Sequence, residues 1–92
     1  MNLTIKFDNQ KNKFYTLVDS KECVVEFRPL DENTWEYYNT YVPLELRGRG
    51  IAAELVAYAL KFAREHEKKV VPSCSYVRSY IERHPEWKDL VS

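Results

Sequence analysis

Arginine and glycine alternate in the segment RGRG, from Arg47 to Gly50, directly before an apolar run. The chain has only 2 glycines, and both lie in this segment. Glycine lets a ligand approach the backbone closely, and the first amides of a helix attract anions because they have no partner within the helix. Arginine suits phosphate oxygens. The segment therefore predicts a phosphate site, although a tight strand-to-helix turn with solvated arginines explains the same residues.

Two known phosphate-binding motifs do not fit this segment. A Walker A loop needs the pattern G-x-x-x-x-G-K-[ST], which is absent from the sequence. The spacing Gly48-x-Gly50-x-x-Ala53 satisfies a relaxed dinucleotide fingerprint. That fingerprint should open a β-α-β unit with an acidic residue near the end of the next strand, whereas here the next strand-like run ends in Pro72 and four others come first. We therefore reject the dinucleotide interpretation.

Cys74 is the side chain best placed for covalent chemistry. It follows Pro72 and stands at the start of a segment with helical periodicity. The unpaired amides at a helix start favour a thiolate, which could act as a nucleophile or move a proton. The alternative is a buried structural cysteine, because free cysteine commonly behaves as a small hydrophobic residue. Cys23 lies on an alternating apolar face, so we expect it in the core.

The elements that must position these residues follow from hydrophobic periodicity. Alternating apolar residues predict four strands, at residues 3–7, 13–19, 22–28 and 34–42. Their short connections predict an antiparallel meander, with a turn over residues 29–33. The second half predicts a helix from Gly50 to about Glu67, a fifth strand at residues 68–72, and a short helix from Ser75 to about Arg83 that Pro85 ends. The expected fold is α+β, in the order ββββαβα.

Composition limits the classes of function. The 92 residues predict one domain, residues 1–92, and 45% apolar residues are enough for a core. Lysine plus arginine and aspartate plus glutamate number 14 each, so no overall field attracts nucleic acid or membrane and any anion site must be local. Two distant cysteines and no long apolar segment predict a cytoplasmic protein. We expect a monomer or a small homo-oligomer. No residue spacing predicts a metal site.

Two segments resemble the GNAT superfamily of N-acetyltransferases. VPLELRGRGIA, Val42 to Ala52, resembles the acyl-CoA pyrophosphate loop with the pattern [QR]-x-x-G-x-[GA], which Arg47, Gly50 and Ala52 satisfy. VVPSCSYVRSYIERHPEW, Val70 to Trp87, resembles the C-terminal signature of a small subfamily, close to V-P-x-C-x-[FY]-V-x-x-Y-I-x-x-H-P-E-[YW]. Together the resemblance covers the chain from residue 42 to its end.

The resemblance implies a site for acetyl-CoA and a transfer of its acetyl group to an amine. Cys74 would carry the acetyl group or shuttle a proton, and Tyr80 would give a proton to the leaving thiolate, although Tyr80 could equally pack against Tyr76. An amide near Tyr41 would polarise the thioester carbonyl, and loop amides would hold the pyrophosphate. The expected binding residues are Tyr41, Val42, Arg47, Gly48, Arg49, Gly50, Ile51 and Ala52. Many members carry a histidine where this chain has Asn39, so catalysis here would be weaker or different.

The expected acceptor is a lysine or N-terminus of another macromolecule, because the helices that help to build the acceptor site in larger members have no counterpart in this sequence. Two alternatives stay open. One is a module that binds CoA or acetyl-CoA without turnover. The other is an RNA-binding β-module, suggested by strand aromatics beside basic residues. The balanced charge and the interleaved strand acids argue against the RNA-binding module, so we expect no nucleic-acid partner.

Overall fold

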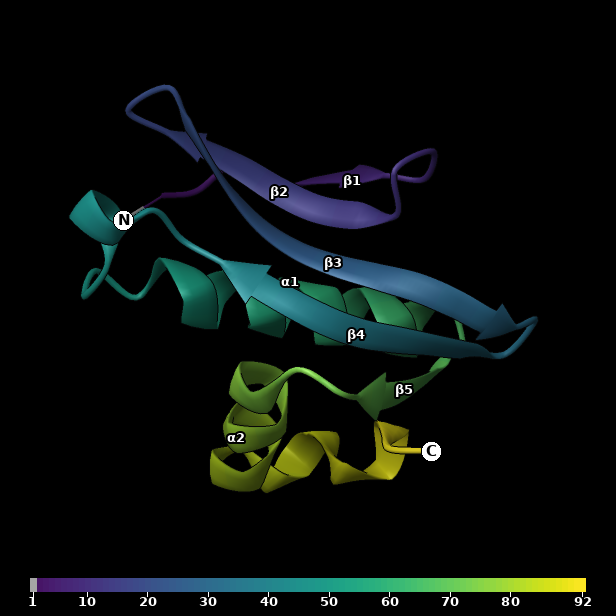
Figure 1. The fold of residues 1–92 in the computed structure, drawn as a ribbon. Coiled ribbons are helices and arrows are strands. Elements are labelled where there is room, and N and C mark those ends of the chain that lie inside the picture. The colour runs from purple at the N-terminus through teal and green to yellow at the C-terminus, as the bar shows by residue number, and fades with distance from the viewer. Residues whose placement is uncertain (1) are drawn as a thin grey trace.

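The computed structural model describes residues 2–92, which form a five-stranded sheet, two α-helices and two short 3-10 helices (Figure 1). The strands lie in the sheet in chain order: β1 (Lys6–Asp8), β2 (Lys13–Val18), β3 (Lys21–Asp31), β4 (Thr34–Tyr41) and β5 (Lys69–Pro72). The helical elements are η1 (Leu44–Leu46), α1 (Ile51–Glu65), α2 (Ser75–Arg83) and η2 (Pro85–Leu90). The expected α+β order is confirmed.

The direction of the strands changes at β4. The strands β1 to β4 pair antiparallel, as predicted for a meander, whereas β5 pairs parallel to β4. Parallel neighbours need a long crossover connection, and α1 provides it. The sheet is therefore mixed, and the chain reaches Cys74 two residues after the parallel strand β5 ends.

The predicted boundaries were wrong for the first and third strands. The first strand begins at Lys6, although Leu3 and Ile5 still pack against the core. The third strand continues to Asp31, through the residues predicted as a turn. The pairing shifts register between Pro29 and Asp31, and such an irregularity accommodates a proline, which has no N–H for the ladder. The helix α2 ends at Arg83 as predicted, but the chain then continues as η2.

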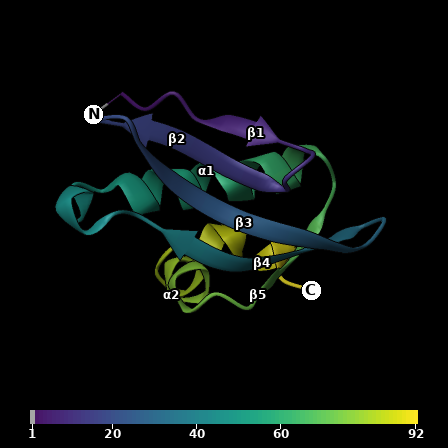
Figure 2. The same ribbon diagram turned by 45° about the horizontal axis from the view of Figure 1, so that its top comes forward.

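The helix α1 covers one face of the sheet, and the core lies between them (Figure 2). Alternate residues of β2, β3 and β4 point to the helix, which presents its apolar positions at helical spacing. Phe7, Phe14, Phe27, Trp35 and Phe62 form an aromatic cluster with ring centroids 4.4 to 6.2 Å apart. The expected core position of Cys23 is confirmed, and burial is the main cause that raises the pKa of its thiol.

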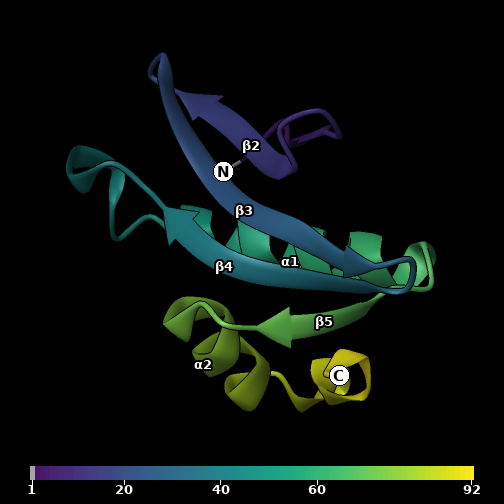
Figure 3. The same ribbon diagram turned by 45° about the vertical axis from the view of Figure 1, so that its right-hand side comes forward.

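The other face of the β2–β4 region carries no helix among residues 2–92 (Figure 3). The helix α2 packs beside β5, against β4, β5 and α1, and η2 returns past the end of α1. The chain ends against β5, where Val91 bridges to Val70 and the Ser92 amide donates to the Val70 carbonyl at 3.0 Å. No helix in the described residues has the length and apolar character to cross a membrane.

Candidate active site

The strand β4 loses its partner on one side halfway along its length. β5 pairs with Thr34 to Tyr37, and the Cys74 amide then donates to the Tyr37 carbonyl at 3.0 Å. Beyond that point, the residues up to Tyr41 pair only with β3 within the described chain. The pairing with β3 also skips Tyr38, which forms a bulge and changes the direction in which the following side chains point. The second half of β4 therefore has a free edge on the side where β5 has ended.

The glycine segment takes up a left-handed backbone. Gly48 has φ +82° and Gly50 has φ +81°, values that glycine adopts without strain and other residues rarely adopt. A Cβ atom at either position would meet no heavy atom within 4 Å, so the space in front of both residues is open. The backbone conformation is therefore a sufficient reason for both glycines, and the space that a phosphate would need is also present.

Six consecutive amides of this segment have no acceptor in residues 2–92. The first helical hydrogen bond of α1 runs from the Glu54 amide to the Gly50 carbonyl at 3.1 Å, and the amides of residues 48–53 donate to nothing in the described chain. The N-cap residue Gly50 has no side chain that could accept a hydrogen bond from these amides, so they stay available to a ligand. Unpaired amides at a helix start form a site for an anion, and the helix dipole favours negative charge there.

A cavity of about 380 Å³ lies between the end of β4, this segment and α2. It is lined by Thr40, Val42, Leu46, Arg47, Gly48, Gly50, Ile51, Ala52 and Tyr76. Six of the eight sequence-predicted binding residues are among these. The other two are Tyr41, which is exposed at the end of β4, and Arg49, which lies 3.9 Å from the Asp19 carboxylate. The Arg47 side chain folds back, and its Nε donates to the Val42 carbonyl at 2.8 Å.

Cys74 lies beside the point where β4 loses its β5 partner. It is half-buried, it is the N-cap residue of α2, and its Sγ lies 3.5 Å from the Thr40 hydroxyl. Because Thr40 also lines the cavity, the thiol adjoins the same space that the glycine segment borders. The structure thus brings the two sequence-predicted segments together around one strand end, with Thr40 between them.

Tyr80 stands apart from the residues that line the cavity. Its ring stacks on His84 with centroids 4.0 Å apart. The pKa of its hydroxyl is raised, first by burial and then by the Glu86 carboxylate and Tyr76, while a hydrogen bond with Trp87 acts in the opposite direction. Tyr76, one turn earlier in α2, lines the cavity instead. The role of Tyr80 as a proton donor stays a prediction.

Three further side chains that could transfer a proton, those of Glu45, His66 and His84, have local partners. The Glu45 carboxylate is hydrogen-bonded to Lys21 at 2.8 Å, and this bond is the main cause that lowers its pKa. The rings of His66 and His84 stack on Phe62 and Tyr80, and each Nδ1 lies 2.9 Å from the carbonyl of that same residue. In residues 2–92 no group of three histidine, cysteine, aspartate or glutamate side chains could hold a metal ion.

Comparison with known proteins identifies the family. The family profile described as GCN5-related N-acetyl-transferase matches residues 13–90. The chain belongs to this family. Protein NATD1 from Mus musculus is 27% identical over 85 residues, which cover 90% of this chain and 77% of the relative. NATD1 from Homo sapiens is 26% identical over 85 residues, which cover 90% of this chain and 75% of the relative.

The fold of this acetyltransferase-family protein also has a solved counterpart. The NMR solution structure of a GCN5-like protein from Staphylococcus aureus superposes with a TM-score of 0.77 at 30% sequence identity. The match covers 99% of this chain and 89% of that chain. The mixed sheet, with its parallel pair β4–β5, is thus the GCN5-related fold, and the resemblance drawn from the sequence is confirmed.

Sequence reasoning missed three residues that line the cavity. Thr40, Leu46 and Tyr76 gave no chemical signal of their own, because threonine, leucine and tyrosine are ordinary residues in strands and helices. Tyr76 could have been found from its distance of two residues from Cys74 at the start of a helix. Thr40 depends on the bulge at Tyr38, which reverses the alternation that the sequence pattern assumes.

Proposed function

We propose that this protein binds acetyl-CoA at the glycine segment and transfers the acetyl group to a primary amine, with Cys74 as the first acceptor. The observation that carries the proposal is the cavity that runs from the unbonded amides of residues 48–53 to Thr40, beside the Cys74 thiol. A ligand with a diphosphate at one end and a thioester at the other matches this pairing of an anion site with a nucleophile.

The residues of the cavity fit such a ligand in two respects. Open space and free amide donors at Gly48 and Gly50 suit a diphosphate, and Arg47 adds positive charge beside them. Apolar side chains of Val42, Leu46 and Ile51 line the wall and suit an aliphatic arm. Acetyl-CoA would supply the activated thioester, and the chain would supply orientation, the nucleophile and proton transfers.

In the proposed first step, the Cys74 sulfur attacks the carbonyl carbon of the thioester. A bond from this carbon to Sγ forms while its bond to the sulfur of CoA breaks, and that sulfur leaves with a proton. A thiolate at Cys74 would lie at the amino end of α2, where the helix dipole favours negative charge, and the Thr40 hydroxyl is within reach to donate to it.

The proton for the departing sulfur comes from a tyrosine of α2 in this scheme. Tyr80 is the donor that the sequence predicted, and its raised pKa keeps it protonated at neutral pH. Tyr76 is the tyrosine that lines the cavity. In the second step an uncharged amine attacks the acetyl carbon, the amide forms, Sγ leaves as a thiolate, and the nitrogen gives its proton to the tyrosinate, which restores the tyrosine. Replacing each tyrosine by phenylalanine in turn tells which one serves.

Intact-mass measurement after exposure to acetyl-CoA tests the proposal. We expect the wild-type protein to gain the mass of one acetyl group, to lose it when a lysine-containing peptide is added, and to transfer it to that peptide. Cys74→Ala should bind acetyl-CoA and gain no mass. An acetyl group on another residue of wild type, or equal transfer by Cys74→Ala, would overturn the role of Cys74.

A module that binds acetyl-CoA without turnover is the second candidate. The observation that favours it is Asn39, which has no titratable group in its side chain. The Asn39 Nδ2 donates a hydrogen bond to the Glu26 Oε1 at 2.7 Å. This candidate predicts saturable binding in calorimetry with no acetyl group on the protein and none on the peptide.

A further inference from the structure

Thr40 lies between the cavity and the Cys74 thiol. The cavity of about 380 Å³ is lined by Thr40, whereas Cys74 is not among its lining residues in the described chain. The Cys74 Sγ lies 3.5 Å from the Thr40 hydroxyl, and the cysteine is half-buried. Thr40 therefore contacts both the cavity and the thiol. An acyl group that enters through this cavity meets the Thr40 side chain before it reaches the sulfur.

The bulge in β4 directs Thr40 toward the thiol. The pairing of β4 with β3 skips Tyr38. Without this extra residue, alternation from the buried Tyr37 would turn Asn39 toward α1 and Thr40 away from it. With it, Thr40 lies opposite the fully buried Val25, on the side of the sheet that α1 covers. The bulge thus places the threonine, rather than its neighbour, beside the cavity and the sulfur.

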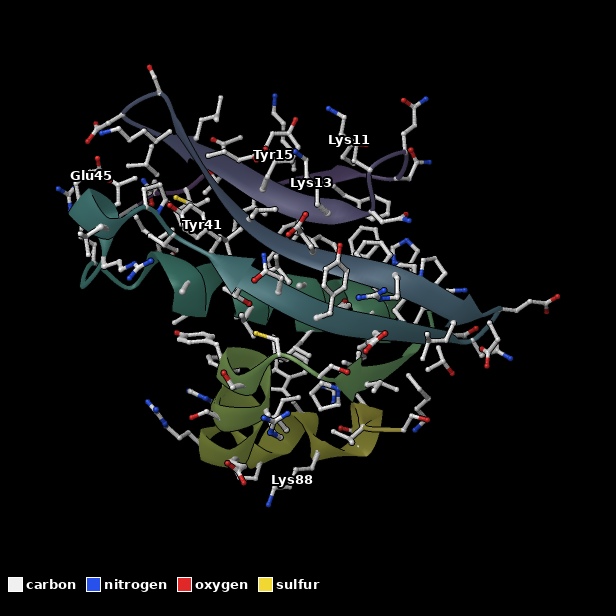
Figure 4. All side chains as sticks on the ribbon, in the orientation of Figure 1. Lys11, Lys13, Tyr15, Tyr41, Glu45 and Lys88 are labelled. Atoms are coloured by element: carbon white, nitrogen blue, oxygen red, sulfur yellow. The ribbon has the colours of Figure 1, made fainter. Side chains whose placement is uncertain are left out.

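Other side chains near the end of β4 do not separate the cavity from the sulfur. Tyr41, which Figure 4 shows at the end of β4, follows Thr40 and lies opposite Val24. It therefore points to the other face of the sheet, where it is 49% exposed. A second, smaller hollow of about 240 Å³ lies at β1 and β2, and its lining residues are Thr4, Lys6, Tyr15, Thr16 and Leu17. The strand β2 lies two strands away from β4, so this hollow offers no route to Cys74.

The core closes the far side of Cys74. Cys74 packs against the core cluster, and its amide donates to the carbonyl of the fully buried Tyr37 at 3.0 Å. Val25, opposite Thr40, and Val77, near the start of α2, are also fully buried. Because protein interiors are close-packed, an acyl chain on the sulfur cannot extend inward without displacing core side chains. The room beside Thr40 therefore limits the length of that chain.

We propose that Thr40 determines the length of the acyl chain that Cys74 accepts, because its methyl group leaves room for an acetyl group and hinders longer ones. This inference rests on the proposed transfer to Cys74. The reaction is the same for each chain length: the acyl carbon exchanges its bond to the CoA sulfur for a bond to Sγ, and the departing sulfur takes a proton. One methylene group changes the specificity of an apolar pocket by about 10-fold to 200-fold, so one methyl group of the protein is enough to set this preference.

Thr40→Ser and Thr40→Val separate the bulk of the side chain from its hydroxyl. Serine lacks the methyl group and keeps the hydroxyl, whereas valine keeps the bulk and lacks the hydroxyl. Thr34→Ser is the matched control, because it makes the same change at the other end of β4, where Thr34 is also half-buried and pairs with Lys69. Thermal unfolding of each variant checks that it folds.

Intact-mass measurement of the acylation of Cys74 by acetyl-CoA and by propionyl-CoA gives the ratio of the two rates. We expect the wild type to favour acetyl by at least about tenfold, and Thr40→Ser to reduce this preference by at least about fivefold. Thr40→Val should react more slowly with both donors and keep the wild-type ratio, and Thr34→Ser should match the wild type. A wild type without preference, an unchanged ratio in Thr40→Ser, or an altered ratio in Thr40→Val would overturn the inference.

Alkyl methanethiosulfonates keep the inference testable if the proposed function fails. The cysteine thiolate attacks the alkyl-bearing sulfur of such a reagent, a disulfide forms and methanesulfinate leaves, so no CoA takes part. We expect the methyl reagent to modify wild-type Cys74 at least about tenfold faster than the propyl reagent, and Thr40→Ser to narrow this difference by at least about fivefold. A protein that gains no acetyl group but shows this size dependence would contradict the proposed function alone. Acetylation of Cys74 without any effect of Thr40→Ser on the size dependence would contradict the role of Thr40 alone.

Discussion

The two halves of β4 differ in nearly every respect although they form one strand. The first half, Thr34 to Tyr37, has a strand on each side and buries Trp35 and Tyr37 under α1. The second half, which ends at Tyr41, has β3 alone as a strand neighbour and borders the cavity and Cys74. An open strand edge leaves backbone and polar groups available to a ligand. One half therefore holds the fold together, and the other is available for chemistry.

The largest effect should come from the first half. Tyr37 is fully buried and its hydroxyl donates to the Ala59 carbonyl, so Tyr37→Ala removes a core ring and a hydrogen bond. We expect a loss of about 3–5 kcal/mol in the free energy of unfolding, measured by urea denaturation. Tyr37→Phe, which loses only the hydroxyl, should cost about 1 kcal/mol. A loss below 1 kcal/mol for the alanine variant would contradict the stabilising role of this half.

Gly50→Asn tests the glycine segment next to the second half. Asparagine tolerates the left-handed backbone better than other side chains, so we expect a loss of stability below about 1 kcal/mol. Its side chain would occupy the open space in front of the amides, and acetyl-CoA affinity measured by calorimetry should fall at least about tenfold. Unchanged affinity would show that the glycines serve the turn alone. Lys88→Asn, remote on η2, is the control.

Thr40→Val tests whether a residue in the second half of β4 affects the reaction at Cys74 more than it affects stability. Valine keeps the shape of threonine but has no hydroxyl to hydrogen-bond with the Cys74 sulfur, so we expect slower acetylation of Cys74, by about fivefold to tenfold. The unfolding free energy should change by less than about 1 kcal/mol because Thr40 is only half-buried. Thr40→Ser should retain the wild-type rate. Equal loss in the serine and valine variants would mean that the methyl group, rather than the hydroxyl, matters.

Asp19→Asn should have the smallest effect of these substitutions, and it should raise the affinity for acetyl-CoA where Gly50→Asn lowers it. Asp19 and Arg49 are both exposed and 3.9 Å apart, so their pairing adds little to stability. Removing the carboxylate frees Arg49 for a phosphate, and we expect acetyl-CoA affinity to rise by about twofold at low salt and less at high salt. Glu45→Gln, which breaks the pair with Lys21 instead, should leave affinity unchanged. A fall in affinity for Asp19→Asn would refute this role of Arg49.

Raising the pH should reduce the free energy of unfolding through Tyr37, in the first half of β4. Burial raises the pKa of Tyr37 above its usual value of 10.0, so the folded state holds the proton more tightly than the unfolded state. The stability due to the protonated hydroxyl is fully present below pH 10.0 and is lost as the pH rises above it. Urea denaturation at increasing alkaline pH should show a smaller decline for Tyr37→Phe than for the wild type. An equal decline in the free energy of unfolding for both proteins would show that Tyr37 does not cause the loss of stability.

The sequence predicted what depends on local pattern. The order of the elements, the approximate span of α2 and six of the residues that line the cavity followed from periodicity, proline and glycine placement, and the family motifs. The bulge at Tyr38 and the extension of β3 past Pro29 did not, because both depend on how two strands adjust to each other. The contact between Glu26 and Asn39 gave no signal either, since only the strand register brings these two residues, 13 apart in the sequence, together.

A titration of the isotope-labelled protein with acetyl-CoA, followed by amide NMR spectra, tests the central claim most directly. If the second half of β4 and the glycine segment form the binding site, the amide signals of residues 48–53, Thr40 and Cys74 will shift in proportion to occupancy. The signals of Trp35 and Tyr37, in the paired half, will stay in place. Shifts that instead fall on Lys6, Tyr15 and Leu17, around the smaller hollow, would contradict the account.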